Sequence, residues 1–416
     1  MSKIKSRLER RKLSGTTETS DDSKSQIIEQ LKRRMEKISR PLHDPATDGD
    51  EQDLPGEEVE TPFGPVLVNT VEYAPDRHHG REPVSGFLSV GEGLAVLGGN
   101  ESLAGLDPTG ALFLDTETTG LSGGTGTLAF LVGVGCLRRD GVFLLEQVFC
   151  RNPTEEQAQL EILSSRLRDA DYLVTFNGRS FDVPLLNTRF VMNRMTNPGA
   201  ALPHLDLLHV ARRIFKRRLD DRSLTALERA VLGFHREGDI PGHAIPAAYA
   251  DYLRGGSTRD MKAVLSHNGL DLLALAALGG VLERMYSNPA AVEHAVDHLG
   301  LARAAMEAGR DDAMDHHLAR AGDLTSGSER CDALHMAARH AARNKRFDQA
   351  RDLWEQIVEI DSADGTAHLA LAKHFEHRKK DYDRALVHAR ETVEVEGDEG
   401  NAHRMARIER KKKKDE

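Results

Sequence analysis

Two carboxylates stand one residue apart at the end of a short apolar run, Leu112-Phe113-Leu114-Asp115-Thr116-Glu117. The run predicts a buried strand, and side chains alternate faces along a strand, so Asp115 and Glu117 project to one side and Thr116 to the other. Neighbouring carboxylates repel each other, and a fold normally tolerates such a pair where a cation neutralises it. This strand end is therefore a candidate Mg²⁺ or Mn²⁺ site.

Length and charge limit what the rest of the chain can be. Its 416 residues suffice for two or three domains, and the net charge of −10 means that a surface for nucleic acid must be a local basic patch. The three cysteines are scattered, which suits a reducing interior, and the chain opens with no signal-peptide pattern. We therefore expect a cytoplasmic protein that is not associated with a membrane.

Charge and hydrophobic periodicity divide the chain into parts. Residues 1–60 are highly charged, which predicts a disordered segment, and residues 61–109 predict an irregular lead-in. Residues 110–287 alternate between strand-like and helix-like runs, which is typical of a mixed sheet flanked by helices in an α/β fold. We expect strands at 111–114, 128–137, 142–149 and 172–176, and helices at 155–168, from Val183 onward, and at 206–218, 222–232 and 259–285.

An imperfect repeat follows within an Ala-rich, all-helical region at 290–400. Segments around Ala313, Ala350 and Ala385 share an Asp and an Ala and recur at intervals of 37 and 35 residues. This spacing is close to the tetratricopeptide period of about 34 residues, in which pairs of helices stack on their neighbours. We expect tetratricopeptide-like repeats there, followed by a solvated basic tail at 401–416.

Two further segments carry acids in suitable places. Asn177-Gly178-Arg179-Ser180-Phe181-Asp182 follows one predicted strand and opens a helix, so Asp182 is either a ligand at the strand end or a helix N-cap. His267 and Asp271 are spaced i, i+4 and share one helix face, where the alternative is an ordinary surface pair. We interpret Asp206 as an N-cap and Phe181 as a core residue rather than a stacking platform.

Together these residues resemble the DEDD exonucleases of the ribonuclease-H-like superfamily. The first motif corresponds to Asp115-Thr116-Glu117, the second runs from Asn177 to Asp182, and the third corresponds to His267 and Asp271, with a histidine at the spacing of the tyrosine subtype. Residues from about 60 to 285 are similar to the bacterial YprB-like group. The supporting runs are Gly123-Gly124-Thr125-Gly126, Leu205-Asp206-Leu207-Leu208 and Asp239-Ile240-Pro241-Gly242.

The resemblance implies a nuclease chemistry. Four carboxylates, Asp115, Glu117, Asp182 and Asp271, would hold two divalent cations, Mg²⁺ or Mn²⁺, on either side of a scissile phosphate. His267 would act as the base or orient the water, because an imidazole exchanges protons near neutral pH. The expected activity is phosphodiester hydrolysis by a 3′–5′ exonuclease at single-stranded RNA or DNA ends.

Substrate contacts are expected in two places. Thr118, Thr119 and Gly120 follow the carboxylate pair, where they would lie close to the terminal nucleotide with Asn177. Arg212, Arg213, Lys216 and Arg217 form a basic ridge that would follow the phosphate backbone, and a solvated helix face is the equal alternative.

Two other functions remain open on the sequence. The helical repeats would bind a protein partner if the chain were an adaptor with an inert core, and the same scaffold would also suit a structure-specific endonuclease. The complete set of four carboxylates argues against the adaptor, because a core free of catalysis has no need for buried like charges.

Overall fold

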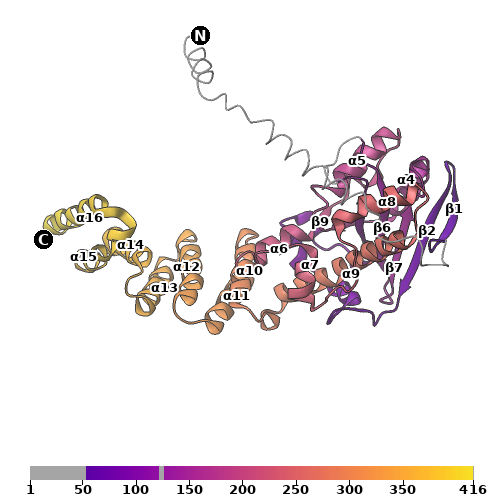
Figure 1. Ribbon diagram of the computed structural model, residues 1–416. Coiled ribbons are helices and arrows are strands. Elements are labelled where there is room, and N and C mark those ends of the chain that lie inside the picture. Colours follow the sequence, from indigo (N-terminus) through magenta and orange to yellow (C-terminus); the bar gives the residue numbers. More distant parts are fainter. Residues whose placement is uncertain (1–52, 121–125, 416) are drawn as a thin grey trace, which may run out of the picture.

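The computed structural model describes residues 53–120 and 126–415. Within these residues an α/β domain is followed by an elongated helical array that ends at the C-terminus (Figure 1). The mixed sheet with flanking helices and the helical C-terminal region confirm the predicted fold class. The YprB-like run from Gly123 to Gly126 lies mostly outside the described residues.

A seven-stranded mixed sheet forms the centre of the first domain, in the order β1-β2-β7-β6-β5-β8-β9. Strands β5, β8 and β9 are parallel to one another, and the other neighbours in this sheet are antiparallel. The carboxyl ends of β5 and β8 therefore meet at one edge. The strands are β1 Glu57–Thr61, β2 Gly64–Tyr73, β5 Ala111–Thr118, β6 Ala129–Leu137, β7 Phe143–Phe149, β8 Tyr172–Thr175 and β9 His204–Asp206, with β3 His78–His79 and β4 Glu82–Pro83 forming a separate pair.

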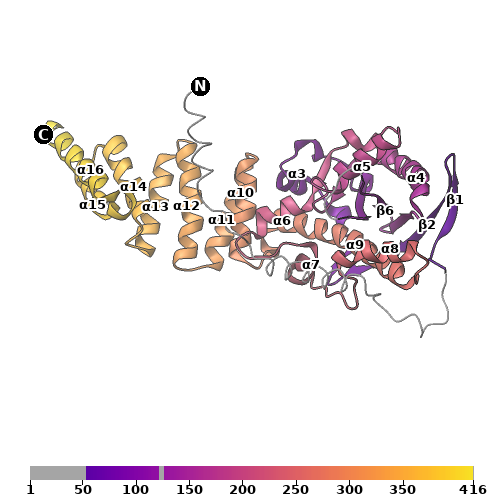
Figure 2. The ribbon, with the colours of Figure 1, turned by 45° about the horizontal axis from the view of Figure 1, so that its top comes forward.

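Helices cover both faces of this sheet (Figure 2). They are α3 Glu92–Gly98, α4 Glu156–Asp169, α5 Asp182–Met192, α6 Leu207–Phe215, α7 Leu224–Leu227, α8 Ile245–Leu253 and α9 Arg259–Ser287. Helices α4 and α5 pack on one face, and α8 and α9 pack on the other. The expected helix at 222–232 begins as α7 and continues as a π-helix over Glu228–Leu232.

The two faces of β5 differ in what they contact. Leu112 and Leu114 belong to the core shared with α4 and α5, whereas Phe113 belongs to the core shared with α9. Because side chains alternate, Asp115 and Glu117 continue the Phe113 face and point toward α9. Thr116 continues the opposite face, toward α5. Helix α9 therefore reaches the end of β5 on the face of Asp115 and Glu117, and helix α5 reaches it on the face of Thr116.

Helix α9 lies at the centre of the domain. It is long and apolar enough to cross a membrane by length and composition, but 72% of its most apolar window is buried inside the protein. Its glycines permit close packing, since a Cβ at Gly280 would lie 2.8 Å from the backbone of Gly86. The helix therefore presents His267 and Asp271 to the sheet from a fixed position.

The segment predicted as an irregular lead-in is part of the sheet. Strand β2 pairs with β7 in antiparallel register, with Val68 opposite Val148, and β1 pairs with β2. The sequence pattern showed only the apolar piece 65–68 of this edge, because residues 69–73 of β2 alternate between half-buried and exposed and include polar residues. Of the segment 1–60 predicted to be disordered, residues 1–52 lie outside the described residues and 57–60 belong to β1.

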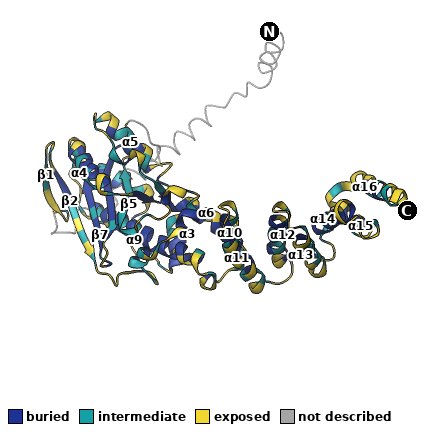
Figure 3. Ribbon diagram, turned by 180° about the vertical axis from the view of Figure 1, so that it is seen from behind, coloured by how far each residue is buried: buried dark blue, intermediate teal, exposed yellow. Residues whose placement is uncertain are grey.

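The helical array contains α10 Ala295–Glu307, α11 Asp311–Leu324, α12 Ser328–Arg343, α13 Phe347–Ile360, α14 Gly365–His374, α15 Tyr382–Ala389 and α16 Val393–Asp415. The three repeated segments open α11, α13 and α15, the second helix of each successive pair. Figure 3 shows buried residues on the inner sides of these helices. The tetratricopeptide assignment itself stays a prediction.

The basic tail is not solvated along its whole length. Residues 401–415 form the last part of α16, where Ile408 is fully buried. Arg407 and Lys411 both bind the buried carboxylate of Glu376 on the preceding helices. Arg404 binds Glu396 and Lys412 binds Asp383, so at least four basic residues of this segment pair within the array.

Part of the predicted basic ridge on α6 contacts the array. Arg213 binds Glu307 at 2.6 Å, and Arg217 binds Asp332. The neighbouring Arg218 binds Asp297, a nearly fully buried carboxylate, at 2.8 Å. These cations therefore already have carboxylate partners at the junction between the two regions.

Gly300 of α10 is predicted to control this junction. A Cβ there would lie 2.7 Å from the Cα of Ile214 on α6, so Gly300→Ala must displace backbone. We expect a loss of about 1–3 kcal/mol in the free energy of unfolding, measured by denaturant titration.

Gly322→Ala is the matched control. A Cβ at Gly322 on α11 meets no heavy atom within 4 Å. This variant should be as stable as the parent or more stable by up to about 1 kcal/mol, because alanine favours the helix. Equal stability of the two variants would contradict the packing argument.

Candidate metal centre

Asp115 and Glu117 carry like charges into a largely buried space. Burial, and then repulsion from Asp271 and Glu117, raises the pKa of Asp115 well above its ordinary value. Burial, followed by repulsion from Asp271 and Asp182, raises the pKa of Glu117 in the same way. The four predicted acids therefore interact electrostatically, although they lie far apart in the sequence.

Three of the predicted side chains form a compact group. Glu117, His267 and Asp271 each offer one ligand atom, and these atoms lie within 4.8 Å of one another. The Nε2 atom of His267 is 3.9 Å from Glu117 Oε1 and 3.7 Å from Asp271 Oδ2. The i, i+4 spacing on α9 thus places imidazole and carboxylate side by side, opposite β5.

Asp239 fixes the orientation of His267. The Nδ1 atom of His267 lies 2.9 Å from each carboxylate oxygen of Asp239. A carboxylate at this position favours a proton on Nδ1, so the lone pair of Nε2 faces Glu117 and Asp271. From the sequence alone, Asp239 is identified only as part of a run that resembles the YprB-like group. The contact between Asp239 and His267 is not predicted by that run.

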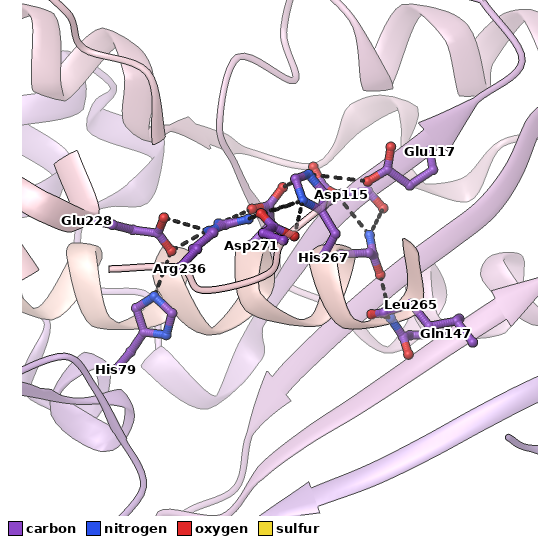
Figure 4. A network of polar contacts seen from close by, with 11 residues as sticks. His79, Asp115, Glu117, Gln147, Glu228, Arg236, Leu265, His267 and Asp271 are labelled. Carbon is purple, nitrogen blue, oxygen red and sulfur yellow. Dashed lines mark hydrogen bonds and ion pairs between the residues drawn. The ribbon is translucent and has the colours of Figure 1, made fainter. Parts of the chain in front are cut away.

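Arg236 supplies the positive charge at the rim of this group (Figure 4). Its side chain is only 4% exposed and binds Glu228 at 2.7 Å and Asp239 at 3.1 Å. It also donates to Asp271 Oδ1, which leaves Oδ2 of that carboxylate toward His267. No sequence pattern predicted Arg236, because it lies in an irregular connection between helices.

Behind Arg236 the network continues into the core. Glu228 is fully buried and also binds Nε2 of His79 at 2.7 Å. His79 belongs to β3 and packs against the Phe234 ring, with ring centroids 4.0 Å apart. The segment predicted as a lead-in therefore helps to hold the carboxylate of Asp271 through two intermediate side chains.

A chain of amides orients Asp115. Asn268 donates to Asp115 Oδ2 at 2.8 Å, and Gln147 donates to Asn268 Oδ1 at 2.9 Å. Gln147 accepts in turn from Asn69 on β2. Gly133, directly opposite Asp115 on β6, leaves the room for Asn268, since a Cβ there would lie 2.1 Å from Asn268 Oδ1.

Asp182 approaches β5 from the other face of the sheet. Its Oδ1 accepts the Thr116 hydroxyl at 2.6 Å, and its helix α5 packs on the Thr116 side. Burial raises the pKa of Asp182 to about 6, against the lowering effect of Thr116. The N-cap of α5 is Phe181 and Asp182 occupies the first helical position, so the N-cap interpretation is not supported.

Asp206 organises the loop that carries Asp182. It caps α6 by accepting from Leu208 N at 3.1 Å, as predicted. It also accepts from the backbone N–H of Asn177 at 2.8 Å and of Arg179 at 3.1 Å. Asn177 has a φ of 66°, a left-handed conformation that this carboxylate stabilises.

Phe181 was predicted to be a core residue, and this prediction is wrong. Its side chain is 56% exposed, directly before Asp182. The apolar pattern around it favoured burial, but the turn after β8 directs the ring outward. The ring is therefore available to a planar ligand.

The predicted substrate residues lie around the end of β5. The Thr118 hydroxyl donates to Gly120 O at 2.8 Å, and Thr119 and Leu128 are joined by two hydrogen bonds of 3.0 Å. Their contact with substrate stays a prediction, as does that of Arg212 and Lys216.

The donor set fits a hard divalent cation. Carboxylate oxygens are the ligands that Mg²⁺ and Mn²⁺ prefer, and the pKa values of Asp115 and Glu117 are raised first by burial and then by their like-charged neighbours, whose repulsion a cation would relieve. Glu117, Asp271 and Asp115 would hold the ion, with Asp182 approaching from the other side of β5.

Comparisons with known proteins agree with this geometry. A family model of the ribonuclease H superfamily matches residues 112–282, which span β5 to α9 and include all four acids. The uncharacterized protein YprB of Bacillus subtilis (strain 168) is 30% identical over 338 residues, covering 79% of this chain and 80% of that protein.

The raised pKa of Asp182 predicts a pH-dependent stability difference. Its folded value of about 6 exceeds the usual 3.8, so its stabilising protonated form is lost as pH rises from about 4 to 6. Without metal, Asp182→Asn should gain up to about 3 kcal/mol relative to the parent across this range. Unfolding by urea at pH 4 and pH 7 measures the change, and an equal difference at both would contradict it.

Removing the partner of His267 should weaken metal binding. Asp239→Asn removes a negative charge beside Glu117 and no longer fixes the proton on Nδ1 of His267, and we expect about tenfold weaker Mn²⁺ affinity by calorimetry. Nitrogen NMR of His267 should show a shifted tautomer balance. Asp323→Asn, on an exposed position of α11, is the control and should bind Mn²⁺ like the parent. Unchanged affinity in Asp239→Asn would exclude this role.

Proposed function

The chain belongs to the YprB family and contains a ribonuclease H superfamily domain, and from this premise we propose that it is a divalent-metal-dependent nuclease. The observation that carries the proposal is the meeting of Glu117, His267 and Asp271 at one point beside Asp115. Acids that are distant in sequence and mutually repulsive are stable together where a cation is bound. A phosphodiester is the substrate that this superfamily and charge pattern favour.

In the proposed reaction, each residue of the centre has a role that follows from its contacts. When bound, divalent cations would activate a water molecule and stabilise the leaving oxygen, and two such ions are the arrangement that the four acids favour. His267 accepts the water proton at Nε2, because Asp239 holds Nδ1 in its protonated form. Asp239 then stabilises the imidazolium that results. Arg236 keeps Asp271 Oδ2 directed at the same centre.

Within this function we propose a 3′–5′ exonuclease acting on single strands. The four acids and the histidine follow the DEDD order, although His267 stands at the tyrosine spacing. The exposed Phe181 ring beside Asp182 is suited to stack on a terminal base. An unpaired strand end can present its terminal base to that ring more readily than a duplex, whose bases are already paired and stacked.

Asp115→Asn should abolish most of the activity. It removes one charged oxygen from the metal centre while Asn268 can still bind the side chain, so the fold should be retained. We expect a 10²–10³-fold loss or more in the rate of Mn²⁺-dependent cleavage of a 5′-labelled oligonucleotide. Asp140→Asn, on the exposed turn between β6 and β7, is the control and should cleave at the parent rate.

The product pattern separates the alternatives. Stepwise shortening from the 3′ end supports the exonuclease, and cuts at internal positions would instead indicate an endonuclease. Absence of cleavage with any divalent ion, on both RNA and DNA, would contradict the proposal and favour an adaptor that acts through the helical array.

A further inference from the structure

A groove in the helical array lies outside the candidate metal centre. It has a volume of about 560 Å³ and is bordered by α12, α13, α14 and the π-helical turn Phe375–Lys379 that extends α14. Figure 1 shows these helices toward the far end of the array, well separated from the sheet. None of the predicted site residues lines this groove.

The floor of the groove is apolar and only partly covered. Trp354, Leu369 and Ala370 line it, and all three are partly exposed. Trp354 also packs against the core that contains Ile357 and Ala367, so its position is fixed. It is the single tryptophan of the chain.

The rim of the groove is positively charged. Arg343, Lys373 and Arg378 line it, and the lining contains no Asp or Glu. Among the described residues these three cations make no ion pair with a carboxylate, whereas the adjacent Lys379 binds Asp348 at 2.7 Å. In a chain of net charge −10, unpaired cations around an apolar floor favour an anionic ligand.

Planar groups are unusually frequent in the same lining. Arg378 lies over the Phe347 ring, and His377 is exposed beside it. His374 forms part of the wall, and its buried Nε2 has no hydrogen-bond partner among the described residues.

We propose that this groove binds a single-stranded nucleic acid, with bases against Trp354 and the Phe347–Arg378 pair and phosphates on Arg343 and Lys373. An acidic peptide would use the cations, but it has no comparable use for several planar side chains, whereas every base has a stackable face. The inference rests on the proposed nuclease function in one respect: the bound strand would be its substrate, held at a second position.

The single tryptophan makes the groove directly observable. Full-length Asp115→Asn protein in EDTA is titrated with oligothymidylate and with oligouridylate, and Trp354 fluorescence is recorded. Stacking should quench it at saturating oligonucleotide. Binding should weaken as salt increases, because phosphate contacts release counterions.

Two substitutions test the residues. Lys373→Ala and Arg343→Ala, each in the Asp115→Asn background, should each weaken binding about tenfold and make the slope of log affinity against log salt shallower by about 1, because each removes one phosphate contact. Lys379→Ala removes a neighbouring cation that is already paired with Asp348, and it should bind like the parent.

Three results would overturn the inference: no quenching by either oligonucleotide, quenching by an oligoglutamate peptide alone, or equal effects of Lys379→Ala and Lys373→Ala. Failure of the nuclease proposal is distinguished by the parent chain with Mn²⁺. Quenching without cleavage retains the groove and rejects the nuclease, whereas cleavage without quenching does the reverse.

Discussion

Repulsion among buried carboxylates is the constraint on which the rest of this structure depends. Asp115, Glu117 and Asp271 lie where burial and mutual charge oppose ionisation, and Arg236 supplies only part of the compensating charge. Buried carboxylates without enough neighbouring positive charge lower the stability of the folded state. Contacts with the surrounding residues must therefore hold these side chains in place. The amide of Asn268 and the carboxylate network around Arg236 provide that support.

The position of α9 explains how the support is built. One face of this helix packs into the core that it shares with β5. Its Gly280 allows the backbone around Gly86 to approach closely. His267, Asn268 and Asp271 are consequently presented to β5 by a helix that cannot rotate without opening the core. The residues that touch them come from elements distant in sequence, namely Gln147 on β7 and Arg236 in a loop.

Positively charged side chains have different environments at the junction between the two regions and in the groove of the array. Arg213 on α6 and Arg217 just after it are paired with the array and hold the two regions together, whereas Arg343 and Lys373 in the array groove make no ion pair among the described residues. Two of the four residues of the predicted basic ridge thus form ion pairs with the array. The groove cations, scattered over two helices, were not recognisable as a group until the helices were packed.

Local patterns in the sequence were sufficient to predict the central strands, most of the helices and the four candidate acids. Alternation along 111–118 placed Asp115 and Glu117 on one face, and the i, i+4 spacing joined His267 to Asp271, because both rules are local. Only the tertiary structure decided that β2 extends the sheet, that Phe181 faces outward, and that Asp239 orients His267. Those contacts join segments separated by long stretches of chain, and a local pattern carries no information about which distant side chain will lie opposite.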